Sequence, residues 1–342
     1  MGVLTVKGTV DVNQFWPDGS SDADTSKILL TIDPDSMVYR KTPIAKSKNV
    51  FKVYSGACTD KALKNPVIEK GAITVRLQGI DAPELHYEPQ KEKSLGSLAK
   101  AANNGVQVVF EYRQAQAETA TVRLGKHLAT KSNKPAVPCT FVTQLDDQKG
   151  PADAIDKYGR FVGDIFVGQE NVNHWILENG LAIVSLYNSL QDDELHDYVK
   201  AWNAGKHKGI GRRYSRALLG FDNTSKFRDP RKGGVQAVNE GTAKFILPKL
   251  YRRQTTWFAY HSLGKFPKDL EAFLHLKDDS DRVLDTTDFL ENGGAAIQQP
   301  FSSCLENGNL LKPKPEALVF IEGAGGLYAR QGNQVKKLTS WP

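Results

Sequence analysis

The chain has little cysteine, no long apolar run and no cluster of cysteine and histidine, and each absence excludes a class of protein. Its three cysteines, Cys58, Cys139 and Cys304, are odd in number and far apart, which argues against a disulfide framework and against a zinc cluster. No apolar stretch approaches the roughly 20 residues of a membrane span. The first residues lack the apolar block and cleavage site of a signal peptide. The sequence as given therefore predicts a cytoplasmic protein with no membrane partner.

What remains is the composition of an ordinary globular protein. Its 342 residues are 40% hydrophobic and 25% charged, which favours about two domains with real cores. The net charge of +6 permits a polyanionic substrate without demanding one. Residues 229–234 (DPRKGG) have the composition of a linker. We interpret residues 1–215 as one domain and residues 216–342 as a smaller mixed domain of unknown function.

One stretch, residues 76–84 (RLQGIDAPE), concentrates charge at the end of a predicted strand. The strand is indicated by β-branched Ile73 and Val75 alternating with Thr74 and Arg76. It ends where Pro83 removes a backbone donor. An isolated pattern of this kind is more often a solvated strand end with a surface ion pair. The rest of the chain changes that interpretation.

Two further motifs stand at the edges of other predicted strands. Residues 22–25 (DADT) precede the apolar strand at 28–32, and residues 156–160 (DKYGR) precede the strand at 161–167. With residues 76–84 they occur in the order D-x-D-T, R-x4-D-x-P-E and D-K-Y-G-R. In this order the chain resembles the staphylococcal (micrococcal) nuclease family, also called thermonuclease-like, over about residues 5–213.

The resemblance implies a calcium-dependent nuclease acting on DNA or RNA. Asp24, Asp81 and the carbonyl of Ala82 match the family's calcium ligands, Glu84 its water-activating carboxylate, Arg76 and Arg160 its phosphate clamps, and Lys157 and Tyr158 its contacts to the substrate's terminal phosphate. The residue types suit these roles, since carboxylates bind a hard cation such as Ca²⁺ and arginine grips phosphate bidentately. Ala23 and Ala82 replace the family's glycine and threonine. Many members are exported, so secretion of a protein whose leader was trimmed is the alternative location.

The fold that the resemblance implies is α+β and mostly β. It is a five-stranded, partly open Greek-key barrel of the OB type with packed helices. Apolar spacing predicts helices at about 118–130, 172–180 and 192–208, with 94–102 as an alternative to the first. Strands are predicted at 3–16, 138–143 and, as a candidate, 106–112. The inserted segment 33–70 is interpreted as an elaborated hairpin or, alternatively, as a lid.

The C-terminal part carries no catalytic motif. Basic and aromatic residues alternate at 249–260, which indicates a packed strand more than a nucleic-acid contact. A late hairpin is predicted at 318–329. Two other functions compete with the nuclease: a module that has lost catalysis and only binds nucleic acid or a partner, and a C-terminal domain that binds a partner. Retention of both arginines and all three carboxylates argues against the first.

Overall fold

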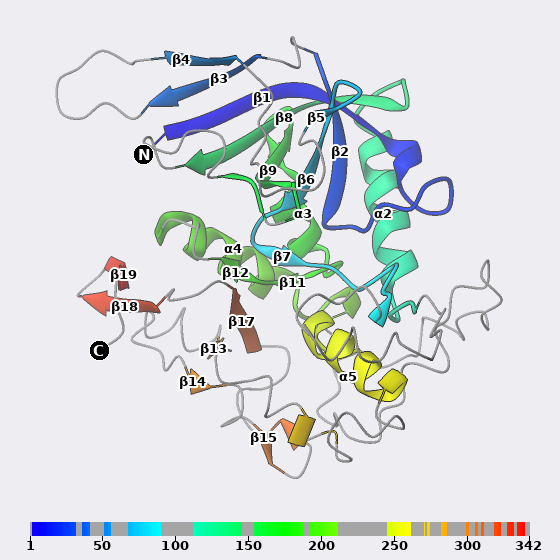
Figure 1. The fold of residues 1–342 in the computed structure, drawn as a ribbon, viewed down its shortest axis with the longest axis vertical. Helices are drawn as coiled ribbons and strands as arrows, with labels where there is room; N and C mark the ends of the chain where they lie inside the picture. The colour runs from blue at the N-terminus through cyan, green and yellow to red at the C-terminus, as the bar shows by residue number, and fades with distance from the viewer. Residues whose placement is uncertain are drawn as a thin grey trace. The chain divides into compact units, whose positions relative to one another are not determined.

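In the computed structural model the chain divides into two compact units (Figure 1). The first, called the barrel unit, holds residues 1–80 and 121–176, and the second, called the C-terminal unit, holds residues 81–120 and 177–342. The division at residue 215 expected from the sequence stays a prediction. The residues described are 2–31, 36–41, 51–55, 68–89, 112–145, 154–156, 158–187, 192–210, 245–260, 270, 272–273, 282–285, 299–300, 305–306, 309–310, 318–322, 327–331 and 334–338.

Five strands of the barrel unit form a closed ring. They are β1 (Gly2–Asp11), β2 (Thr25–Leu30), β6 (Ala72–Leu77), β8 (Ala136–Leu145) and β9 (Phe161–Val167). β1 pairs with β2 and β8, β2 with β6, and β8 with β9, all antiparallel, whereas β6 and β9 are parallel. The predicted five-stranded OB-type barrel is therefore confirmed, and its ring is closed rather than partly open.

Alternation of apolar and polar residues explains why these segments fold as barrel strands. In β6, Ile73, Val75 and Leu77 are buried, while Thr74 and Arg76 stand on the outer face. The same period supplies further members of the barrel core, which include Leu4, Val6, Val10, Ile28, Phe141, Phe161 and Ile165. Burial of each such side chain stabilises the barrel by about 1.5–3 kcal/mol. The outer face of β6 is left to carry polar side chains.

The inserted segment forms the predicted hairpin. β3 (Ser36–Lys41) and β4 (Phe51–Ser55) pair antiparallel, and β3 also pairs with the start of β1. β2 and β6 pair directly with each other, so the hairpin extends the sheet without separating them. The short elements β5 (Ile68–Glu69), β10 (Glu170–Asn171) and the 3-10 turn η1 (Val12–Gln14) complete the barrel unit.

Helix positions in the first 210 residues follow the apolar spacing. The structure has α2 at Ala117–Ala129, α3 at Val172–Glu178 and α4 at Asp192–Gly205. The buried stripe of α2 is Ala117, Ala120, Thr121, Leu124 and Leu128, as its spacing predicts. The predicted strand at 3–16 is shorter, because η1 follows Asp11. Residues 94–102 and all but the last residue of 106–112 lie outside the described residues.

The C-terminal unit differs from expectation in two places. Residues 249–260 form not a strand but most of a helix, α5 (Pro248–Tyr260). The predicted hairpin at 318–329 is also wrong: β17 (Leu318–Glu322) pairs with β12 (Leu186–Tyr187) and β13 (Arg282–Asp285), and β18 (Leu327–Gln331) pairs instead with β19 (Gln334–Leu338). The remaining strands are β11 (Ile183–Val184), β14 (Gln299–Pro300), β15 (Leu305–Glu306) and β16 (Asn309–Leu310).

β7 (Ile80–Asp81) lies where the sequence passes from the barrel unit into the C-terminal unit. Within the described residues, none of the helices combines the length and apolar character needed to cross a bilayer.

Candidate active site

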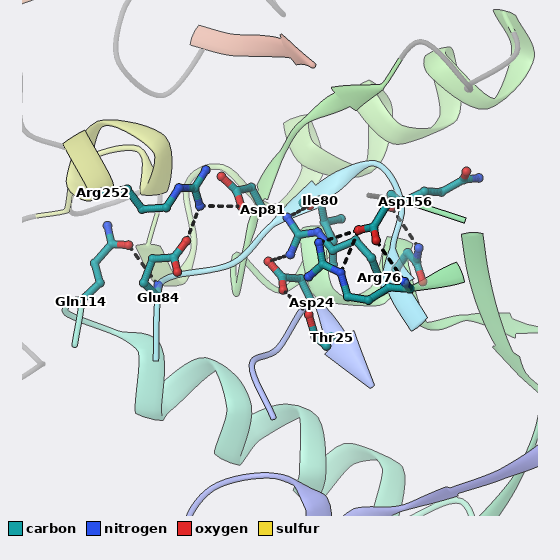
Figure 2. A network of polar contacts seen from close by, with 12 residues as sticks. Asp24, Thr25, Arg76, Ile80, Asp81, Glu84, Gln114, Asp156 and Arg252 are labelled. Atoms are coloured by element: carbon teal, nitrogen blue, oxygen red, sulfur yellow. Dashed lines mark hydrogen bonds and ion pairs between the residues drawn. The ribbon is translucent and has the colours of Figure 1, made fainter. Parts of the chain in front are cut away.

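Asp24 and Arg76 meet at the edge of the barrel where β2 begins. Thr25 pairs with Arg76 across the two strands, and the backbone N–H of Leu77 donates to the carbonyl of Asp24 over 2.8 Å. The guanidinium of Arg76 forms an ion pair with the buried carboxylate of Asp24. Its Nη2 also donates to the carbonyl oxygen of Ile80 over 3.2 Å (Figure 2). One arginine thus connects the first and second sequence motifs.

A glutamine fixes the turn that carries Asp24. The side-chain Oε1 of Gln14 accepts a hydrogen bond of 2.6 Å from the backbone N–H of Lys27. It also accepts from the hydroxyls of Ser21 and Ser26, each over 3.3 Å. Residues on both sides of Asp24 are therefore held by one side chain. Sequence reasoning missed Gln14, because nothing local indicates that it contacts residues seven to thirteen positions further on.

The chain turns sharply after β6, which directs the second motif out of the barrel. Gly79 has φ +73°, a left-handed conformation that only glycine adopts without strain. The preceding Gln78 donates from Nε2 to Asp164 over 2.8 Å, and its carbonyl accepts from Nδ2 of Asn173 over 3.0 Å. Because Gln78 is buried and bonded on both sides, the point at which the chain leaves β6 is fixed.

Arg160 is positioned by Asp156, four residues before it. Oδ2 of Asp156 accepts from Nε and Nη2 of Arg160 over 2.8 and 2.7 Å. Oδ1 accepts from the backbone N–H groups of Tyr158 and Arg160 over 2.9 and 3.0 Å. The guanidinium also lies 5.2 Å from the ring centre of Tyr158, which is 44% exposed. Lys157 lies outside the described residues.

Arg76 lies on β6, and Arg160 lies directly before the neighbouring strand β9. Val75 on β6 pairs with Phe161 on β9 in parallel register. Arg160 directly precedes Phe161 in the chain, and Arg76 directly follows Val75. Asp156 was part of a sequence motif, but its role as the anchor of Arg160 was not predicted. The spacing of an aspartate four residues before an arginine is a usable signal for such a contact.

Glu84 and Asp81 belong to the C-terminal unit. The backbone N–H of Glu84 donates to Oε1 of Gln114 over 3.1 Å, and the N–H of Gln114 donates to the carbonyl of Glu84 over 2.7 Å. Asp81 and Ala82 are buried. Nη1 of Arg252, on α5, contacts the Glu84 carboxylate and lies 3.6 Å from Oδ1 of Asp81 (Figure 2). Arg252 was named in the sequence only as one member of a basic and aromatic stretch.

The predicted metal ligands provide the right chemistry for a hard cation. Asp24 and Asp81 are buried carboxylates and Ala82 supplies a backbone carbonyl, which are the oxygen donors that Ca²⁺ takes together with water. In the part of the chain that the structure describes, no group of three or more His, Cys, Asp or Glu side chains lies close enough to hold a metal ion. The predicted calcium ligands include only two such side chains, Asp24 and Asp81, together with one backbone carbonyl. Calcium binding stays a prediction.

Comparison with known families supports the resemblance over part of the chain. Residues 74–211 match the model of a family described as staphylococcal nuclease homologue. This segment contains Arg76, Asp81, Ala82, Glu84 and Arg160 and ends before α5. The resemblance seen in the sequence is confirmed over this segment, as is the fold it implies. No curated protein matches the chain.

Proposed function

We propose that the protein is a nuclease that hydrolyses phosphodiester bonds of DNA or RNA with the help of Ca²⁺. The observation that carries this proposal is a pair of arginines, one on β6 and one directly before the neighbouring strand β9, each contacted by an aspartate, in a segment that matches nuclease homologues. An arginine held by a carboxylate keeps a fixed direction. Because a guanidinium has five N–H donors, Arg160 has more donors than the two it gives to Asp156. These arginines are suited to bind a phosphate.

Each residue then has a role in phosphodiester hydrolysis. Arg76 and Arg160 bind the phosphoryl oxygens and stabilise the charge that develops on them. Glu84 accepts a proton from the attacking water, whose oxygen forms a bond to phosphorus as the bond to the leaving oxygen breaks. Asp24, Asp81 and the carbonyl of Ala82 would hold Ca²⁺, which would supply charge neutralisation at the phosphate. Lys157 and Tyr158 contact a terminal phosphate of the substrate.

The test compares Glu84→Gln with wild type on supercoiled and single-stranded DNA and on RNA. We expect cleavage by the wild type with Ca²⁺, none with chelator, and a loss of about 10²–10⁴-fold in turnover for Glu84→Gln, because the base is removed while size is kept. Glu178→Gln, the same change at an exposed site at the end of α3, is the matched control. Full activity in chelator, or near-full activity of Glu84→Gln, contradicts the proposal.

A second function is favoured by the contact between Arg252 and Glu84. A carboxylate that is occupied by an arginine of the same chain also fits a scaffold that binds nucleic acid without cutting it. This function predicts binding of labelled DNA or RNA by the wild type with no cleavage under any calcium concentration. It further predicts that Glu84→Gln leaves the affinity for nucleic acid unchanged. Cleavage by the wild type that Glu84→Gln abolishes rules it out.

A further inference from the structure

Helix α5 brings a cation to the acidic residues of the second motif from far along the sequence. Arg252 is 168 residues from Glu84 and lies outside the segment that matches nuclease homologues. Its single Nη1 atom contacts Glu84 and approaches Asp81. The proposed function assigns water activation to Glu84, and metal binding to Asp81 together with Asp24 and the carbonyl of Ala82. Arg252 therefore forms ion pairs with two carboxylates that the proposed reaction needs.

The position of Arg252 is fixed by the way α5 packs within the C-terminal unit. The carbonyl of Ile246, just before the helix, accepts from Nε2 of Gln114 over 2.7 Å, and Gln114 in turn holds the backbone of Glu84. Near the end of the helix, the hydroxyls of Thr256 and Tyr87 share a buried hydrogen bond of 2.7 Å. Arg252 lies between these two contacts.

Burial of α5 makes the placement more than a surface contact. Leu250, Tyr251, Gln254, Thr255 and Thr256 are all buried. The ring of Tyr251 meets that of Tyr87 edge to face, 6.4 Å between centres. The backbone that carries Arg252 is thus anchored to the same short segment that carries Glu84. A packed helix, rather than a loop, positions the guanidinium of Arg252 at the carboxylates.

The charges of this cluster oppose the binding of a second cation. The Asp81, Glu84 and Arg252 side chains are only 7%, 14% and 27% exposed, so their interactions are less screened by water than those of surface ions. Two carboxylates alone carry charge −2, and Arg252 reduces this to −1. A divalent ion approaching Asp81 meets a weaker attraction and a like charge a few ångströms away. It also finds one oxygen of Glu84 already accepting a charge-assisted hydrogen bond.

We propose that Arg252 is a built-in competitor of the metal ion and sets the calcium affinity of the site. This inference rests on the proposed function. While Arg252 contacts Glu84 and Asp81, the site is latent, and calcium binding must displace the guanidinium from these carboxylates. A region with no catalytic motif of its own thereby determines the calcium concentration at which the nuclease becomes active. Arg252 acts through the two carboxylates and is a positioning residue, not a catalytic one.

The experiment measures calcium binding directly, by isothermal titration calorimetry of the full-length protein with CaCl₂ in the absence of nucleic acid. Arg252→Gln removes the charge, and we expect its Kd for Ca²⁺ to fall about tenfold or more below that of the wild type. Arg253→Gln makes the same change at the next position of the same helix and should stay within about twofold. Arg252→Lys keeps the charge but loses the planar fork, so its Kd should lie between those of wild type and Arg252→Gln.

The outcomes separate this inference from the proposed function. Calcium binding by the wild type with an equal or higher Kd in Arg252→Gln overturns the inference and leaves the proposed function intact. The absence of calcium binding in both proteins overturns both. Thermal melts check that each variant is folded. If Arg252→Gln does not fold, Arg252→Lys decides: tighter binding than wild type supports the competitor role, and an unchanged Kd overturns it.

Discussion

The barrel unit and the C-terminal unit differ in how ion pairs involve their proposed functional side chains. In the barrel unit, Arg160 is a proposed functional group, and Asp156, which has no proposed role in the reaction, orients it. In the C-terminal unit the functional groups are the carboxylates, and a distant arginine, Arg252, contacts them. The same ion-pair chemistry therefore serves orientation in the first unit and, by our inference, competition in the second.

The difference lies in what each ion pair leaves available. Asp156 uses its two oxygens on one guanidinium and on backbone N–H groups, and a phosphate can bind the remaining donors of Arg160 without displacing Asp156. Arg252 instead contacts the carboxylates that calcium and water are proposed to use. An ion pair that leaves hydrogen-bond donors available orients a side chain for its ligand. An ion pair that involves the atoms to which the ligand would bind competes with that ligand. Substitutions in each unit can test this difference.

The largest expected effect is on the barrel side. Arg160→Lys keeps the positive charge but loses the planar fork that contacts Asp156 and is proposed to bind phosphate. We therefore expect turnover to fall about 10²-fold, the magnitude found when one transition-state donor is removed. Arg123→Lys, at an exposed position of α2, should leave turnover unchanged. The measurement is the initial rate of calcium-dependent DNA cleavage. Equal rates for Arg160→Lys and wild type would show that Asp156 holds a structural arginine.

The contrast also explains what the sequence could predict. The strand at 161–167 depends on residues a few positions apart, and the barrel was implied by the resemblance of three short motifs to a known family. The contact of Asp156 with Arg160 also joins residues only four positions apart, but it was not predicted. The helix at 118–130 appeared within one residue of its predicted ends, at Ala117–Ala129. Local patterns carried these predictions.

Contacts between distant residues carried no such signal. The alternation of basic and aromatic residues at 249–260 predicts a packed strand with solvated basic side chains. The structure has a helix there instead, whose contacts include hydrogen bonds to Tyr87 and Gln114. The pairing of β17 with β12 joins residues more than 130 positions apart, and the predicted local hairpin lost to it. Arg252 could be named in the sequence, but its partners could not, since nothing in residues 245–260 indicates the 81–84 segment.

A smaller effect is expected from loosening α5. Tyr87→Phe removes the hydroxyl that shares a buried hydrogen bond with Thr256, and we expect the free energy of unfolding to fall by about 1–2 kcal/mol, because a buried polar partner loses its hydrogen bond. Tyr158→Phe, at an exposed ring, is the control for stability alone. Chemical denaturation measures both. If Tyr87→Phe leaves the free energy of unfolding unchanged, this contact does not anchor α5 and does not fix the position of Arg252.

The smallest expected effect tests an ion pair of the barrel unit that has no proposed function. Burial raises the pKa of Glu170, but hydrogen bonds from His127 and Lys131 outweigh it, so the pKa lies below its ordinary value of 4.5. His127 also stacks on Trp175, with 3.7 Å between ring centres. A carboxyl whose pKa is lowered by folding adds stability above its unfolded pKa and loses it as the pH falls through the folded value.

Glu170→Gln should therefore destabilise the protein near neutral pH and make little difference in acid. Because the side chain of Glu170 is 31% exposed, water screens the ion pair and we expect a difference in unfolding free energy of about 0.5 kcal/mol, below 1 kcal/mol. Denaturation of both proteins between pH 7 and pH 3 measures it, with Glu178→Gln as the exposed control. The gap between wild type and Glu170→Gln should stay constant down to about pH 5 and close below pH 4.5. A gap that widens in acid would mean that folding raises the pKa of Glu170, and that this ion pair does not stabilise the barrel unit.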